Sequence, residues 1–214
     1  MKVYTYYSMV DCLVDGELIE LWKRTWTMHG WEPVVLNEQD AQVADPERFA
    51  KWENHILLTT NNPPRYARAA LMRWLAMTAI DEPCIHVDWD VMCNGLRVDD
   101  ITEEFVSWNR PIFFTGSCPC AIAGNGEAWR LLADMMDLAN KLKAFDIEAL
   151  RHDSTDQYAM SIMPNNLYRT MKKNHCLFYN EGEGWEHSLT IHFPTRLTNY
   201  PRSNVVKKVY FDGV

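Results

Sequence analysis

The spacing of apolar residues along the chain predicts an alternation of strands and helices. In residues 17–30 the side chains of Leu18, Leu21 and Trp26 recur at helical spacing, and Gly30 ends the run. The same spacing predicts three further helices, over residues 65–80, 126–145 and 153–163. Runs rich in β-branched and aromatic residues predict strands over residues 2–8, 32–37, 84–90, 111–116, 120–124, 189–193 and 205–211.

The order of these segments indicates the fold class. A strand, a helix and a second strand follow one another within residues 2–37, which is how a parallel sheet begins. Residues 38–64 predict irregular surface with one short helix and end in the turn-forming sequence Asn-Asn-Pro-Pro. We therefore predict a single α/β domain over residues 1–214, in which helices flank a mixed but mostly parallel central sheet.

Composition narrows the class of partner. The chain has 214 residues, of which 47% are hydrophobic and 23% charged, as in an ordered globular protein. Its formal net charge of −8 argues against nucleic acid or an anionic membrane as the main partner. A phosphate-bearing ligand remains compatible with that charge, because a divalent cation can bridge acidic side chains to phosphate.

The cysteines and the N-terminal residues bear on the compartment. No apolar run approaches the roughly 20 residues of a membrane span, and the first residues lack the apolar core of a secretory signal. The six cysteines lack the spacing of a disulfide framework, and Cys118 and Cys120 alone supply two of the four ligands of a structural zinc site. We expect reduced cysteines, no transmembrane segment and a cytoplasmic protein.

Two carboxylates at the end of an apolar run are the first candidate for chemistry. If residues 84–90 are extended, Asp88 and Asp90 lie on one face at the carboxyl end of a strand, where open parallel sheets bind their ligands. Adjacent carboxylates repel each other, and a divalent cation removes that repulsion. A polar turn in which both residues cap backbone groups is the other interpretation of the same triplet.

Four segments, one of which contains the two aspartates, carry a resemblance that favours the metal site. They are RYARAALMRWLA (65–76), IHVDWDVM (85–92), STDQYAMSIM (154–163) and IHFPTR (191–196). Together they span most of residues 65–196 and resemble the nucleotide-sugar-dependent glycosyltransferases of the GT-A fold. The likeness is to the DXD sugar-binding and glycogenin/galactosyltransferase-like retaining families, and it implies a GT-A-like, Rossmann-like sheet.

The resemblance implies a metal centre and a catalytic pair. Asp88 and Asp90 would match the DXD motif, which holds Mn²⁺ or Mg²⁺ against the donor diphosphate. His192 would match a late histidine that completes the metal shell, and a mixed nitrogen and oxygen shell suits Mn²⁺ better than Mg²⁺. Asp156 and Gln157 would match the pair that lies beneath the transferred sugar.

The remaining implied roles concern the donor. Residues 1–110 would form the nucleotide-binding half that ends in the DXD motif, and residues 111–214 the half that binds the acceptor and completes the metal shell. The implied activity is a retaining hexosyltransferase that uses a nucleoside diphosphate sugar, with a UDP-sugar favoured, and an unknown glycan, protein or small-molecule acceptor. The implied donor contacts are Thr5, Tyr6 and Tyr7 at the end of the first strand, Arg65 and Arg68 on the following basic helix, and Arg196.

Departures from the family pattern leave alternatives open. The segment before Asp88 is Asp-Glu-Pro-Cys-Ile-His where many relatives have Gly-Gly-x-Tyr, so the donor is not specified. The run CIHVDWDVM also resembles the first motif of haloacid-dehalogenase phosphohydrolases, in which Asp88 would be the nucleophile. A non-catalytic protein of the GT-A fold that binds a nucleotide sugar or glycan is the third alternative. If a transferase inverted configuration, Asp156 or Asp153 would be the base.

Overall fold

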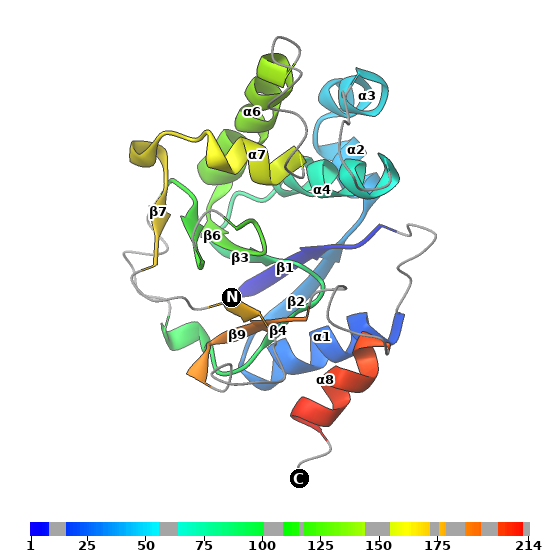
Figure 1. Cartoon of the computed structure of the whole chain (residues 1–214), viewed down its shortest axis with the longest axis vertical. Helices are drawn as coiled ribbons and strands as arrows, with labels where there is room; N and C mark the ends of the chain where they lie inside the picture. The colour runs from blue at the N-terminus through cyan, green and yellow to red at the C-terminus, as the bar shows by residue number, and fades with distance from the viewer. Residues whose placement is uncertain are drawn as a thin grey trace.

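A six-stranded sheet forms the centre of the computed structural model, which describes residues 1–8, 16–55, 64–100, 109–115, 118–143, 155–171, 176–178, 187–193 and 201–211. Its strand order is β2-β1-β3-β6-β5-β7 (Figure 1). The strands are β1 (Lys2–Tyr6), β2 (Glu32–Leu36), β3 (Cys84–Val87), β5 (Ile112–Phe113), β6 (Ala121–Gly124) and β7 (Arg169–Thr170). The pairs β1–β2, β1–β3 and β5–β7 are parallel, whereas β6 runs antiparallel to both neighbours, which confirms the predicted mixed, mostly parallel sheet.

Helices cover both faces of this sheet and enclose two apolar cores. One face carries α2 (Glu38–Ala44), α3 (Pro46–His55), α4 (Pro64–Met77), α6 (Gly126–Lys143) and α7 (Thr155–Ser161) (Figure 1). The core beneath them includes the fully buried rings of Trp52, Trp74 and Trp129. No helix in the described part of the chain is long and apolar enough to cross a membrane.

The opposite face carries two helices and a second, smaller sheet. The helices are α1 (Gly16–Met28) and α8 (Arg202–Tyr210), and the sheet has the order β4-β9-β8, with β4 (Val91–Cys93), β9 (Thr190–His192) and β8 (Cys176–Phe178). The second core lies here and includes Trp22, Trp26 and Phe193. The indole N–H groups of Trp26 and Trp31 donate to the carbonyls of Val91 and Leu96, which fixes α1 and the following turn against the chain that leaves β3.

The prediction for residues 38–64 is wrong. Residues 38–64 were expected to be mostly irregular, but the described part of this range forms α2 and α3. The side chain of Asn37 accepts the backbone N–H of Gln39, and the Asp40 carboxylate accepts the N–H of Asn37, so a capping box starts α2. Pro46 is the first residue of α3, a position where its missing N–H has no cost.

The C-terminal strand predicted over residues 205–211 is a helix. Its valines have high strand propensity, but in α8 they pack against the second core, the one that includes Trp22, Trp26 and Phe193, and Val206 is completely buried. An ion pair between Lys207 and Glu17 holds α8 against α1. Tertiary packing therefore overrides local propensity here. The strands β7 and β8 were not predicted. They have two and three residues, which is shorter than the runs of about four to eight residues over which a strand pattern is recognised.

A glycine in β6 permits the close approach of α6 to the sheet. A Cβ atom at Gly124 would lie 2.7 Å from Cβ of Ala128 and 3.4 Å from the Trp129 ring. We expect Gly124→Ala to lower the free energy of unfolding by about 1–3 kcal/mol, because the strand or helix must shift. Gly16→Ala is the matched control, since a Cβ there meets no described atom within 4 Å. Denaturant unfolding of both variants checks this, and equal stability of the two would contradict it.

Candidate metal centre

The two aspartates lie in the turn that joins the two sheets. Strand β3 ends at Val87, so the prediction that residues 84–90 form one extended strand is wrong beyond that point. The backbone N–H of Asp88 donates to the carbonyl of Cys120 (2.8 Å), and the N–H of Val91 donates to the carbonyl of Asp88 (2.9 Å). The chain thus turns through Asp88 and Asp90 and enters β4.

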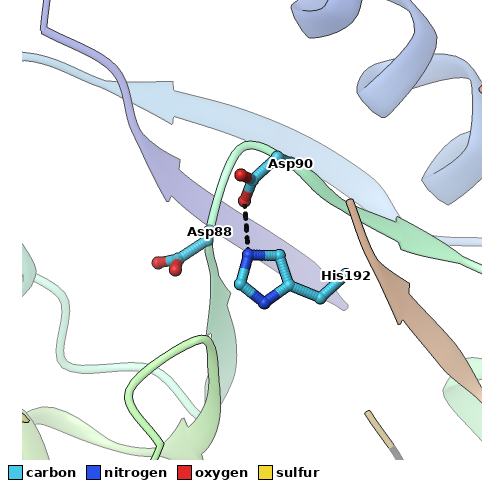
Figure 2. A group of neighbouring side chains, drawn as sticks. All are labelled: Asp88, Asp90 and His192. Carbon is cyan, nitrogen blue, oxygen red and sulfur yellow. Dashed lines mark ion pairs between the residues drawn. The ribbon is translucent and has the colours of Figure 1, made fainter. Parts of the chain in front are cut away.

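Pairing within the small sheet brings His192 to the aspartates. β4 and β9 are antiparallel, with Val91 opposite His192, and the N–H of Phe193 donates to the carbonyl of Asp90 (2.8 Å). The His192 Nε2 atom lies 3.2 Å from Asp90 Oδ1 (Figure 2). One ligand atom from each of Asp88, Asp90 and His192 lies within 4.8 Å of the other two. Two carboxylates and an imidazole at this spacing fit a divalent cation and leave room for further oxygen ligands.

An arginine that the sequence prediction missed links Asp88 to Asp156. Arg73 of α4 donates from Nη1 to Asp88 Oδ1 and from Nη2 to Asp156 Oδ2. The indole N–H of Trp74 also approaches Asp156 Oδ2, at 3.4 Å, and Asp156 is only 2% exposed. Asp156, predicted to act with Asp88 and Asp90, therefore belongs to the same network. The available signal was an arginine flanked by apolar residues on both sides in the helix, Met72 and Trp74.

A second missed arginine neutralises Asp90. Arg202, the first residue of α8, donates from Nη1 to Asp90 Oδ2 at 2.6 Å and is only 6% exposed. Its guanidinium lies over the Trp89 ring at 4.1 Å from the centroid, and the Tyr7 ring meets Trp89 edge-on at 5.3 Å. Trp89, the middle residue of the DXD triplet, thus contacts both a guanidinium and a tyrosine ring. The mistaken strand prediction for residues 205–211 hid this role of the C-terminal segment.

Burial and charge shift the protonation of the three candidate ligands in different directions. Burial raises the pKa of Asp88 above its usual value, although the guanidinium of Arg73 opposes that change. Burial acts on Asp90 in the same direction, but the charges of His192 and Arg202 outweigh it and lower the pKa of Asp90. Burial disfavours the charged form of His192, yet the Asp90 and Asp88 carboxylates outweigh that effect and raise its pKa to about 9. Protonated His192, Arg73 and Arg202 thereby balance Asp88, Asp90 and Asp156.

Of the predicted donor contacts, only Tyr7 is seen to reach the residues around Asp88 and Asp90 in the described part of the chain. Thr5 and Tyr6 are buried in β1, whereas Tyr7 follows the strand and reaches Trp89. Arg68 Nη1 lies 4.0 Å from Glu53 Oε1, so this arginine pairs with α3. Arg65 is on the first turn of α4, and the side chain of Gln157 is exposed on α7. Arg196 lies outside the described residues. The roles expected for these side chains stay predictions.

Comparison with solved structures identifies the fold. Neither a protein-family model nor a curated protein sequence matches the chain. The glycosyltransferase GlyE of Streptococcus pneumoniae TIGR4 matches over 99% of this chain with a TM-score of 0.58 and 11% identity, and the match covers 63% of GlyE. The chain thus spans less than two thirds of that protein's length.

Two smaller glycosyltransferases match over nearly their whole length. The galactosyltransferase LgtC, solved with donor and acceptor sugar analogues, matches over 98% of this chain and 96% of its own, with a TM-score of 0.56 and 9% identity. A glycosyltransferase involved in glycosylation of the major capsid of PBCV-1 covers 96% of this chain, with 98% of its own covered, a TM-score of 0.53 and 10% identity. The chain therefore has the GT-A fold expected from its sequence.

Proposed function

We propose that this chain, which has the GT-A fold, is a metal-dependent glycosyltransferase that moves a sugar from a nucleoside diphosphate sugar to an acceptor. The observation that carries the proposal is the convergence of Asp88, Asp90 and His192 at the carboxyl end of β3. Ligands of open α/β sheets bind at such strand ends, and a hard cation is the usual partner of paired carboxylates and phosphate. The match to an enzyme solved with both donor and acceptor analogues supports a sugar donor over other phosphate ligands.

In this proposal the three ligands hold the cation and the arginines position the ligands. When bound, Mn²⁺ or Mg²⁺ supplies Lewis-acid stabilisation of the departing diphosphate. Arg73 fixes the carboxylates of Asp88 and Asp156 relative to each other, because one planar guanidinium contacts both. We assign Asp156 and Gln157, on the first turn of α7, to the side of the transferred sugar.

The contacts of Asp156 favour transfer with retention of configuration. A base for an inverting reaction needs a free lone pair directed at the acceptor hydroxyl. The Asp156 carboxylate instead receives Arg73 and the Trp74 indole, and it is almost completely buried. In a retaining reaction the departing phosphate accepts the proton of the acceptor, so Asp156 serves to orient rather than to remove a proton.

The nucleotide is assigned to the end of β1. The strand end at Thr5 and Tyr6 is followed by Tyr7, whose ring pairs with Trp89 beside the metal centre. Aromatic faces of this kind suit a base or ribose. Arg65 and Arg68 on α4 and Arg196 remain the proposed contacts to the donor. We favour a UDP-sugar and a hexosyl group on the sequence resemblance.

Ligand-linked stabilisation is the experiment that tests the proposal. The full chain would be heated with a panel of nucleoside diphosphate sugars, with and without Mn²⁺ or Mg²⁺, and the hits assayed for hydrolysis and transfer. We expect a donor that raises the melting temperature only when the cation is present. Binding without turnover to any acceptor would instead support the non-catalytic alternative. An aspartyl-phosphate analogue trapped on Asp88 would support the phosphohydrolase.

Cation binding should depend on pH through His192. Below a pH of about 9 the imidazole carries a proton, and only the neutral ring can bind a cation, so binding releases a proton. We expect the affinity for Mn²⁺ to rise by about tenfold per pH unit toward pH 9 and then to level off. Calorimetry at several pH values measures this slope. His192→Asn should lose the slope and His29→Gln, in the turn that follows α1, should keep it; an affinity that is flat with pH contradicts the assignment.

A further inference from the structure

Two buried cysteines lie in contact beside the candidate metal centre. The Sγ atoms of Cys120 and Cys176 are 3.7 Å apart, and each residue is only 1% exposed. They come from segments far apart in the sequence, since Cys120 directly precedes β6 and Cys176 begins β8. Cys118 stands two residues before Cys120 and is partly exposed. Cys118 is thus the more exposed cysteine next to this buried pair.

The other described cysteines do not share this arrangement. The Cys93 thiol donates to the carbonyl of Leu96 at 3.3 Å, and Cys84 is buried in β3. Among the described residues, neither of these thiols hydrogen-bonds to another sulfur, as Cys120 does with Cys176. The contact between Cys120 and Cys176 joins the start of β6 in the central sheet to the start of β8 in the small sheet.

Backbone pairing links both cysteines to the segments that carry the candidate metal ligands. The carbonyl of Cys120 accepts the backbone N–H of Asp88 at 2.8 Å. In the small sheet, Cys176 is paired with Thr190, two residues before His192. A bond between the two sulfurs would therefore join the segment that holds the Asp88 backbone to the strand beside His192.

We propose that Cys120 and Cys176 form a reversible disulfide, that Cys118 is the thiol through which a small-molecule disulfide reaches them, and that the bond weakens cation binding by Asp88, Asp90 and His192. The disulfide itself does not depend on the proposed function. The effect of the disulfide on cation binding does rest on the proposed function.

The chemistry balances as three thiol–disulfide exchanges. The Cys118 thiolate attacks an external disulfide such as oxidised glutathione, which forms a mixed disulfide and releases one thiol. The Cys120 thiolate then displaces the second external thiol from Cys118. The Cys176 thiolate attacks the Cys120 sulfur and releases Cys118 as a thiolate. In total Cys120 and Cys176 lose two electrons and two protons, and one external disulfide is reduced to two thiols.

The disulfide would change the geometry around the cation. An S–S bond is about 2.05 Å long, so the two sulfurs must approach by about 1.6 Å from their present 3.7 Å. The backbones of Cys120 and Cys176 must supply whatever part of this movement side-chain rotation does not. Metal sites tolerate errors of only about 0.2 Å in ligand distances, so a shift of Asp88 relative to His192 lowers the affinity.

Peptide mapping after equilibration in glutathione buffers tests the bond. We expect oxidised full-length protein to contain the tryptic peptides 98–130 and 174–196 as one linked species, reversed by reduction. Cys120→Ala and Cys176→Ala should abolish that species, and Cys84→Ala, a buried cysteine in β3, should not. Cys118→Ala should slow its formation at least about tenfold and leave its equilibrium yield unchanged, since it removes only the relay. A linked species that persists in Cys120→Ala, or no linked species in the unsubstituted protein, would overturn the proposal.

Calorimetry of Mn²⁺ binding tests the consequence. We expect the oxidised protein to bind Mn²⁺ at least about tenfold more weakly than the reduced protein, and Cys176→Ala to bind equally before and after oxidant treatment. Equal affinities of the oxidised and reduced protein would overturn the link between the disulfide and the cation. Failure of both forms to bind Mn²⁺ would count against the proposed function and this link together, while the mapping result still decides the disulfide.

Discussion

Replacing Asp88 or Asp90 by asparagine is expected to lower divalent-dependent turnover of the donor by at least about a hundredfold while the chain remains folded. Each substitution removes one negative charge from the three-residue cluster and keeps the side-chain volume. A neutral amide oxygen is a weak ligand for a hard cation. The proposed Lewis-acid contribution is therefore lost in both variants. Steady-state assays with and without Mn²⁺ measure the effect.

The two variants should differ in stability, which separates the cation from the fold. Asp90 lies between Arg202 and His192, so Asp90→Asn leaves the buried guanidinium without a charged partner. We expect a loss of about 1–3 kcal/mol in unfolding free energy, and a smaller loss for the less buried Asp88. Asp99→Asn, in the exposed turn Val98–Asp100, is the matched control. Undiminished turnover in both Asp88→Asn and Asp90→Asn would contradict the metal-dependent mechanism.

Local patterns were sufficient to predict the parts of this fold that lie in long, periodic segments. The helices α1, α4 and α6 and the strands β1 and β2 follow directly from apolar spacing that tertiary packing does not oppose. The grouping of Asp88, Asp90 and His192 was also predictable, but only through the family resemblance. Nothing in the spacing of residues 90 and 192 reveals that β4 and β9 pair in the register that joins them.

The counter-charges of the site could not be predicted from sequence, because they depend on packing between distant elements. The apolar neighbours of Arg73 set it apart in the sequence, but nothing local shows that α7 brings Asp156 to its side. Arg202 reaches Asp90 because α8 is a helix, and the local valine-rich sequence indicated a strand. Both arginines serve the same physical need. Carboxylates buried to hold a cation are unstable alone, so the fold supplies its own positive charges.

That need predicts a large effect of removing Arg73. Arg73→Met leaves the carboxylates of Asp88 and the almost completely buried Asp156 without their shared guanidinium, and we expect a loss of about 3–5 kcal/mol in unfolding free energy. Adding Asp156→Asn to the variant should recover part of the loss, because the amide carries no charge. Arg68→Met is the matched control on the same helix, since its half-exposed ion pair with Glu53 contributes at most about 1 kcal/mol.

A divalent cation should partly replace the missing guanidinium. Mn²⁺ neutralises Asp88 directly, so its stabilising effect should be larger in Arg73→Met than in the unsubstituted protein, where Arg73 already balances that carboxylate. Thermal unfolding of both proteins over a series of Mn²⁺ concentrations measures the difference. If Arg73→Met is as stable as Arg68→Met, or if Mn²⁺ stabilises both proteins equally, then Arg73 does not hold the carboxylates of this site in balance.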